Sequence, residues 1–296
     1  MKKFLKLFSA FALIFCCMFS FVGCNIFEDN TKQEYANLVA ERKIVREVVS
    51  NTKVMLESNI EQEAEPALTS SDISAKAGDV SNNENLVDAA QMLISNISII
   101  DIIINGSDFV PGKIYNLELE QPDGTMTYFL LNAYCGEGDV VTLNLSMLEG
   151  SKDNRVYATA STLMSLDVYY NNEHKPIKMV DYQSNCRFGE GNQFQRFTFR
   201  EMAYSSNGQA ESYYEAELTN NYEGDSIQSQ EKCVINVDNN GTETIYEGAE
   251  ITGEIESAFD TAIEIATERS YIYSFARPLT KDVLHKLLEF IAPSES

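Results

Sequence analysis

The sequence predicts an α+β fold, in which a large, curved antiparallel β-meander of about eight to ten strands packs with N- and C-terminal helices. Three observations predict it. Turn signals recur between residues 112 and 247. The runs between these turns are rich in β-branched and aromatic residues, and apolar and polar residues alternate in several of them. Before and after this region, apolar residues recur at helical spacing.

The first 23 residues have the layout of a secretory signal peptide. Three lysines precede an uncharged apolar run from Leu7 to Val22. This run is short for a membrane span, which needs about 20 apolar residues. Its ending, Phe21-Val22-Gly23-Cys24, resembles the lipobox of bacterial lipoprotein precursors, with Phe21 where that pattern usually has an aliphatic residue.

The resemblance implies that the leader, residues 1–23, is removed and that Cys24 carries diacylglycerol as the first residue of the mature protein. It predicts an extracytoplasmic protein that is anchored to a bacterial membrane by a lipid on Cys24. A single acyl chain holds a protein on a membrane only marginally, so the several chains on such a cysteine are needed for stable anchoring. An ordinary secretory leader, with Cys24 unmodified, is the alternative.

The charge of the chain restricts its partners. It has 45 acidic and 22 basic side chains, a formal charge of −23. Because the leader contains lysines and no acidic residue, the mature body is still more acidic. Such a body lacks the basic surface that nucleic acids require, and we expect no nucleic-acid partner. An anionic membrane surface repels it, so the domain should stand away from the membrane on its anchor.

The remaining chain divides by composition. Residues 24–33 are interpreted as a tether, and a capping box beginning at Thr31 opens an amphipathic helix over 34–60. Residues 61–83 are polar, contain Pro66 and lack aromatic residues, which is typical of a flexible linker. The α+β domain is expected over residues 84–296.

This domain begins with an apolar helix that a second capping box at Ser81 opens and that ends near residue 104. Asp88 and Asp101 interrupt it, which favours a core helix over a membrane span, and its Ile-rich end is compatible with a strand. The strand meander is expected over about 112–247 and C-terminal helices over about 254–291, the second of them beginning at Pro278.

Alternation within the strands predicts a sheet that is buried on one side. From Val141 to Met147, Val and Leu residues alternate with Thr, Asn and Ser. We therefore expect the helices to pack against a single, concave face of the sheet.

The sequence contains no catalytic motif, no metal-ligand spacing and no cofactor fingerprint. His174, in a turn, and His285, on the last helix, are interpreted as solvated or core-edge residues. The segment Asp238-Asn239-Asn240-Gly241 resembles the start of a calcium loop, but Ala249 occupies the position of the final Glu, which favours a hairpin turn.

Three cysteines follow Cys24 in the chain, so at most one disulfide can form among them. They are Cys135, Cys186 and Cys233. The alternative is that all three are small buried side chains without a disulfide.

Three functions remain open. The first is a non-enzymatic domain that binds an apolar or amphiphilic ligand in its curved sheet, by analogy with lipid carriers of similar architecture. Tyr128, Phe197 and Phe199 would line such a cavity, unless they pack in the core. The second is a module that docks or supports another envelope protein. The third is a hydrolase that uses dispersed carboxylates.

Overall fold

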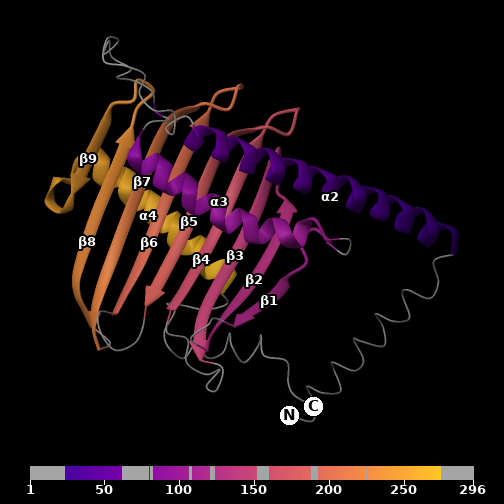
Figure 1. Cartoon of the computed structure of the whole chain (residues 1–296), viewed down its shortest axis with the longest axis horizontal. Coiled ribbons are helices and arrows are strands. Elements are labelled where there is room, and N and C mark those ends of the chain that lie inside the picture. The colour runs from indigo at the N-terminus through magenta and orange to yellow at the C-terminus, as the bar shows by residue number, and fades with distance from the viewer. Residues whose placement is uncertain are drawn as a thin grey trace, which may run out of the picture. The chain divides into compact units, whose positions relative to one another are not determined.

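The computed structural model describes residues 24–61, 80, 83–106, 109–120, 124–151, 160–187, 193–224 and 226–274. Within these ranges it contains three long helices, one short 3-10 helix and a nine-stranded sheet (Figure 1). The chain divides into two compact units, residues 1–41 and 42–296. All of the packing described below lies within the second unit.

The sheet confirms the predicted antiparallel meander. Its order is β1-β2-β3-β4-β5-β6-β7-β8-β9, so every strand pairs with the next one along the chain. The strands are β1 (Tyr115–Glu120), β2 (Thr125–Cys135), β3 (Val140–Ser151), β4 (Ala160–Tyr170), β5 (Pro176–Arg187), β6 (Gln193–Tyr204), β7 (Ala210–Glu223), β8 (Ser226–Val237) and β9 (Glu243–Glu247).

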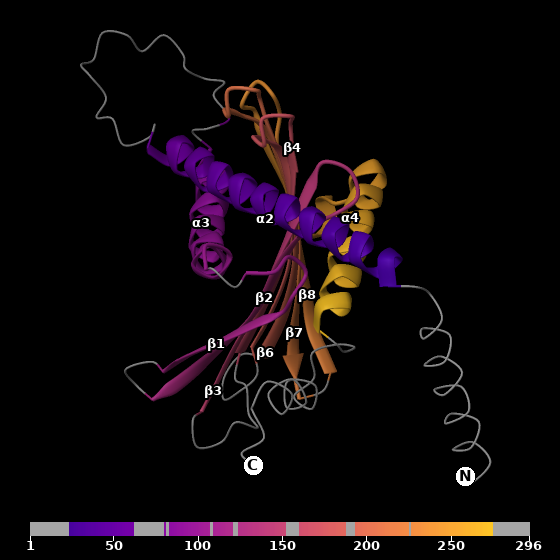
Figure 2. The ribbon, with the colours of Figure 1, turned by 90° about the vertical axis from the view of Figure 1, so that its right-hand side faces the viewer.

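Helices cover both faces of this sheet, so the prediction of one-sided burial was wrong. Helices α2 and α3 pack on the face that carries Met179, whereas α4 packs on the opposite face, which carries Val180 (Figure 2). The physical reason lies in the central strands. There, apolar side chains point to both faces, as Val180, Phe197 and Phe199 do toward α4, and each face needs its own cover.

Helix α2 spans Cys24–Glu61, so residues 24–33, predicted as a tether, are helical. The predicted start at Thr31 was wrong because neither Gly nor Pro separates it from Cys24, and a helix that has nucleated extends at little cost. In the second unit, Val45, Val48 and Leu56 are buried against the sheet.

Helix α3 spans Glu84–Ile104, which confirms the predicted helix and shows that its Ile-rich end is not a strand. Its N-cap is Asn83 rather than the predicted Ser81, and the Asn83 side chain accepts a 3.1 Å hydrogen bond from the backbone N–H of Leu86. By length and composition α3 is apolar enough to cross a membrane. In the fold, one side of it, including Leu93 and Ile97, is buried in the core with α2 and the sheet.

Helix α4 spans Gly253–Ser274 and follows the short 3-10 helix Gly248–Glu250. It buries one stripe of side chains, Phe259, Ala262, Ile263 and Ala266. The second predicted C-terminal helix, after Pro278, lies outside the described residues, as do the leader and most of the predicted linker 61–83.

Candidate functional site

A pocket of about 600 Å³ opens where α4 passes over strands β3 and β4. We call it the α4 pocket. Its lining combines aromatic, aliphatic and charged side chains: Tyr134, Cys135, Gly136, Glu137, Val140, Thr142, Asp167, Tyr169 and Arg269.

The register of the sheet brings the pocket residues together. Thr142 of β3 pairs with Tyr134 of β2 on one side and with Asp167 of β4 on the other, so the three side chains form one row. Side chains that pair directly across antiparallel strands lie on the same face. Arg269 then reaches this row from the last part of α4.

Asp167 forms the polar floor of the pocket and is 3% exposed. The hydroxyl of Thr142 donates a 2.7 Å hydrogen bond to its Oδ1, and Nη2 of Arg269 lies 2.6 Å from its Oδ2. The guanidinium of Arg269 also lies 5.2 Å from the ring centre of Tyr182. Both oxygens of Asp167 are therefore engaged, and the floor is an ion pair that the Thr142 hydroxyl also contacts.

The walls of the pocket are less polar than its floor. Tyr134, Val140 and Tyr169 are half-buried, and Glu137 is exposed in the turn between β2 and β3. The pocket therefore offers an apolar wall and a charged, hydrogen-bonding floor to the same molecule. This combination suits an amphiphilic ligand better than a purely apolar one.

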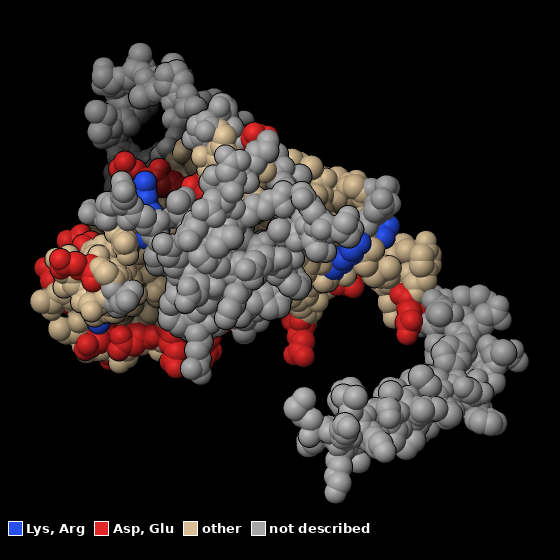
Figure 3. Space-filling view, turned by 90° about the horizontal axis from the view of Figure 1, so that it is seen from below, with Lys and Arg blue, Asp and Glu red and all other residues tan. Residues whose placement is uncertain are grey.

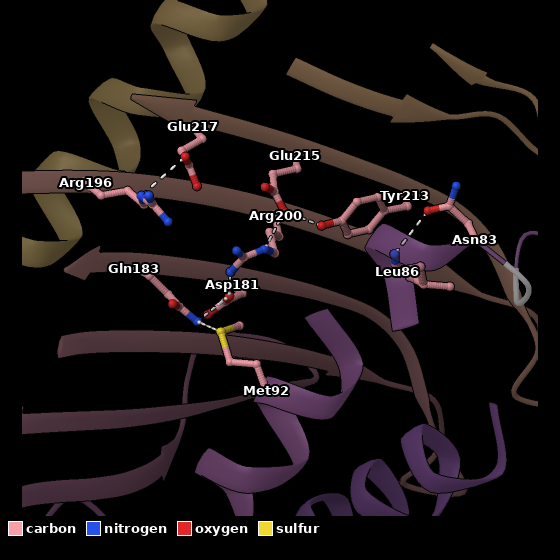
Figure 4. Close-up of polar contacts among 10 residues, drawn as sticks. All are labelled: Asn83, Leu86, Met92, Asp181, Gln183, Arg196, Arg200, Tyr213, Glu215 and Glu217. Atoms are coloured by element: carbon pink, nitrogen blue, oxygen red, sulfur yellow. Dashed lines mark hydrogen bonds and ion pairs between the residues drawn. The ribbon is translucent and has the colours of Figure 1, made fainter. Parts of the chain in front are cut away.

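A second group of charged residues lies on the opposite face of the sheet, near α3 (Figure 4). Nη1 of Arg200 lies 3.0 Å from Oδ2 of Asp181, and its Nε lies 2.6 Å from Oε2 of Glu215. Gln183 donates a 2.9 Å hydrogen bond to Asp181, and the hydroxyl of Tyr213 donates to Glu215. Arg200 of β6 thus bridges a carboxylate of β5 and a carboxylate of β7, the two strands that flank it.

Burial governs the titration of this group. It raises the pKa of Asp181 to about 6, although Arg200 and Gln183 act in the opposite direction. Burial lowers the pKa of Arg200, but Glu215 and Asp181 outweigh it, so the guanidinium stays charged. A hydrolase would need two carboxyl groups facing each other across an accessible cleft. Here Arg200, whose side chain is 12% exposed, lies between them, which favours a structural role for both carboxylates.

The aromatic residues singled out in the sequence do not line the α4 pocket. Phe197 and Phe199 are buried beneath α4, where the Phe199 ring lies 5.6 Å from the ring of Tyr182, and Tyr128 is 3% exposed. The interpretation as core residues is confirmed. Sequence reasoning missed Tyr134 and Tyr169, although each precedes a predicted turn by two residues, which places both at the same end of the sheet.

His174 lies in the turn between β4 and β5 and is fixed by helix α2. Its Nδ1 lies 2.6 Å from Oε2 of Glu47, and its carbonyl accepts a 2.8 Å hydrogen bond from Asn51. His174 is therefore a core-edge residue rather than a solvated one, and the sequence analysis had allowed both interpretations. His285 lies outside the described residues.

The remaining sequence predictions have mixed outcomes. Asp238 accepts two 2.9 Å backbone hydrogen bonds, from Asn240 and Thr242, which confirms the hairpin turn. Cys135, Cys186 and Cys233 form no disulfide with one another. Among the described residues, no group of His, Cys, Asp and Glu side chains is placed to hold a metal ion. The side chain of Cys24, the predicted lipid site, is not described.

Acidic side chains dominate the outer face of α4. Figure 3 shows Asp and Glu gathered toward the end of the sheet that carries β9. The exposed acidic residues of α4 are Glu254, Glu256, Asp260, Glu264 and Glu268. The acidic exterior contrasts with the Arg269 side chain that the same helix sends to the pocket floor.

Comparison with models of protein families, with curated proteins and with solved structures finds no match to this chain.

Proposed function

We propose that the protein is a bacterial lipoprotein, held outside the cytoplasm by a lipid on Cys24, whose domain binds a small amphiphilic molecule in the α4 pocket without chemical turnover. The observation that carries the proposal is the mixed lining of this pocket. Its volume of about 600 Å³ is in the range of about 300–1,000 Å³ that small-molecule sites occupy.

In the proposed complex, the two parts of the pocket have different roles. Tyr134, Val140 and Tyr169 would contact the apolar part of the ligand, and the polar part would lie against the Asp167–Arg269 ion pair. Hydrogen bonds to charged groups are stronger than those to neutral groups, so this floor would fix the orientation of the ligand. The paired state of Asp167 and of the Arg200 group supports binding rather than hydrolysis.

A specific feature of β8 favours docking of an envelope protein as the second candidate function. Strand β9 pairs only with residues Cys233–Val237 of β8. Residues 226–231 are exposed, and within the described part of the chain they pair with β7 alone. An open strand edge of this kind can accept a strand from another protein.

Native mass spectrometry of the chain Asn25–Ser296, produced in a bacterial envelope and purified without detergent, tests the proposal. We expect a stoichiometric small-molecule adduct. Val140→Trp fills the pocket and should remove the adduct. The control is Ile245→Trp, since Ile245 is a 45% exposed residue of β9, far along the sheet from the pocket; it should keep the adduct.

Three outcomes would contradict ligand binding in the pocket. A bare monomer mass, together with capture of a defined envelope protein that depends on β8, would support the docking function. A dimer mass would indicate that the chain is its own partner. An adduct that survives Val140→Trp would place the ligand elsewhere.

A further inference from the structure

The side chains that line the α4 pocket carry an excess of negative charge. Among the described residues, the lining contains the carboxylates of Glu137 and Asp167 and a single cationic group, Arg269. Nη2 of Arg269 lies 2.6 Å from Oδ2 of Asp167, so these two charges balance each other. The charge of Glu137 remains, and Asp139, which is also exposed, lies in the same turn between β2 and β3. The pocket therefore attracts a positively charged ligand and repels a negatively charged one.

The floor of the pocket and the row beside it are rich in hydrogen-bond acceptors. A carboxylate has about four lone-pair sites, so Asp167 can accept further hydrogen bonds besides its contacts with Thr142 and Arg269. In the next cross-strand row on the same face, Asn144 pairs with Ser165, and these residues are 6% and 4% exposed. Within the described part of the chain, neither Oδ1 of Asn144 nor Oγ of Ser165 has a hydrogen-bond partner. Because buried acceptors without a partner cost free energy, a ligand that donates hydrogen bonds suits this region.

Two tyrosine rings line the pocket from the strands that flank β3. Tyr134 of β2 pairs with Thr142, and Tyr169 of β4 pairs with Val140. These two strands are about 10 Å apart, which is twice the strand spacing. A cation interacts with an aromatic ring from within about 6 Å of the ring centre. Nζ of Lys178 already lies 5.7 Å from the ring centre of Tyr169. The spacing of the strands is thus compatible with a cation that contacts both rings.

We propose that the α4 pocket selects an amphiphile whose polar group is a protonated amine and which carries no anionic group. The ammonium group would donate hydrogen bonds to Asp167. The carbon chain next to it would lie between Tyr134 and Tyr169, over Val140. This inference rests on the proposed function, because it names the class of ligand for the same pocket.

Calorimetric titration with three probes of equal chain length tests the inference. The probes are decylammonium, decanol and decanoate, each below the concentration at which it forms micelles, and the protein is Asn25–Ser296 purified as above. We expect decylammonium to bind at least about tenfold more tightly than decanoate, because the two probes differ mainly in the sign of their charge. Decanol, which is neutral, should have an intermediate affinity.

Variants of the lining separate its charge from its shape. Glu137→Gln should weaken the binding of decylammonium by about threefold, as expected for an exposed charge, and leave decanol unaffected. The control Glu211→Gln, which changes an exposed residue of β7, should leave both affinities unchanged. Tyr169→Leu should also weaken the binding of decylammonium, whereas Tyr169→Phe, which keeps the aromatic ring, should retain it.

The outcomes distinguish this inference from the proposed function. If decanoate or decanol binds as tightly as decylammonium and Val140→Trp abolishes this binding, the pocket takes a ligand but the preference for an amine is wrong. Decylammonium binding that survives Val140→Trp would reflect attraction to the acidic surface and would overturn the inference. If none of the probes binds, the inference is overturned, whereas an adduct that is lost in Val140→Trp would still support ligand binding in the pocket.

Discussion

Nδ2 of Asn59, near the end of helix α2, donates a 2.9 Å hydrogen bond to the carbonyl of Gly208 in the turn between β6 and β7. The same helix holds the turn between β4 and β5 through Glu47 and His174. Helix α2 is thus attached to the tips of two hairpins by polar contacts, in addition to its apolar packing. These turns lie at the same end of the sheet.

Gly208→Ala should destabilise the fold more than Gly138→Ala does. Both glycines have positive φ, +84° and +78°, which costs an alanine about 1–2 kcal/mol. A Cβ at Gly208 would also lie 3.3 Å from Cγ of Met55, whereas one at Gly138 would meet nothing within 4 Å. Urea unfolding measures the free energy of unfolding of both variants. Equal losses of this free energy would show that the contact of the new Cβ with α2 carries no cost.

Arg200→Met should cost about 3–5 kcal/mol of folding free energy, because it leaves the buried carboxylate of Asp181 and the half-buried carboxylate of Glu215 without their cation. Arg196→Met is the control on the same strand. The Arg196 side chain is 44% exposed and lies 3.3 Å from Glu217, and an exposed ion pair contributes less than about 1 kcal/mol. Denaturant unfolding at pH 7.5 compares the two. A small loss in both variants would contradict the bridging role of Arg200.

Asp181→Asn should change how stability depends on pH. Burial raises the pKa of Asp181 from 3.8 to about 6, so the folded state binds this proton more tightly than the unfolded state. Ionisation of Asp181 therefore removes stability as the pH rises through this window, by up to about 3 kcal/mol.

The measurement is the unfolding free energy of the wild type minus that of Asp181→Asn, at pH 4.5 and at pH 7.5. This difference should be smaller at pH 7.5, because only the wild type carries the buried charge. Were the difference constant or larger at pH 7.5, Asp181 would have an ordinary or lowered pKa in the folded protein.

Cys24→Ala should abolish lipid attachment. If the leader functions as its resemblance implies, the mature protein carries acyl chains on Cys24 and partitions into detergent. The alanine variant should lack the mass of the acyl chains. It should either remain in the aqueous phase or keep residues 1–23. Cys17→Ala serves as the control, since Cys17 is removed with the leader. Mass spectrometry of the N-terminal peptide decides, and an acylated peptide from Cys24→Ala would contradict the assignment.

The elements that were predicted correctly have local causes. Asn207-Gly208 and Asp238 to Gly241 predict hairpin turns because side-chain hydrogen bonds and positive φ angles decide such turns within a few residues. Helix α3 was predicted from its apolar composition. The start of α2 was missed because a capping box marks a favourable start without preventing the helix from extending toward Cys24.

The sequence by itself determined the antiparallel meander, the helices that precede and follow it along the chain, and the acidic character of the body, since these follow from local periodicity, turn chemistry and composition. Only the tertiary structure decided that helices cover both faces and that a pocket forms beside α4. Asp167 lies 25 residues from Thr142 and 102 residues from Arg269. Contacts at such separations depend on strand register and on the diagonal path of α4, which packing of the whole sheet determines.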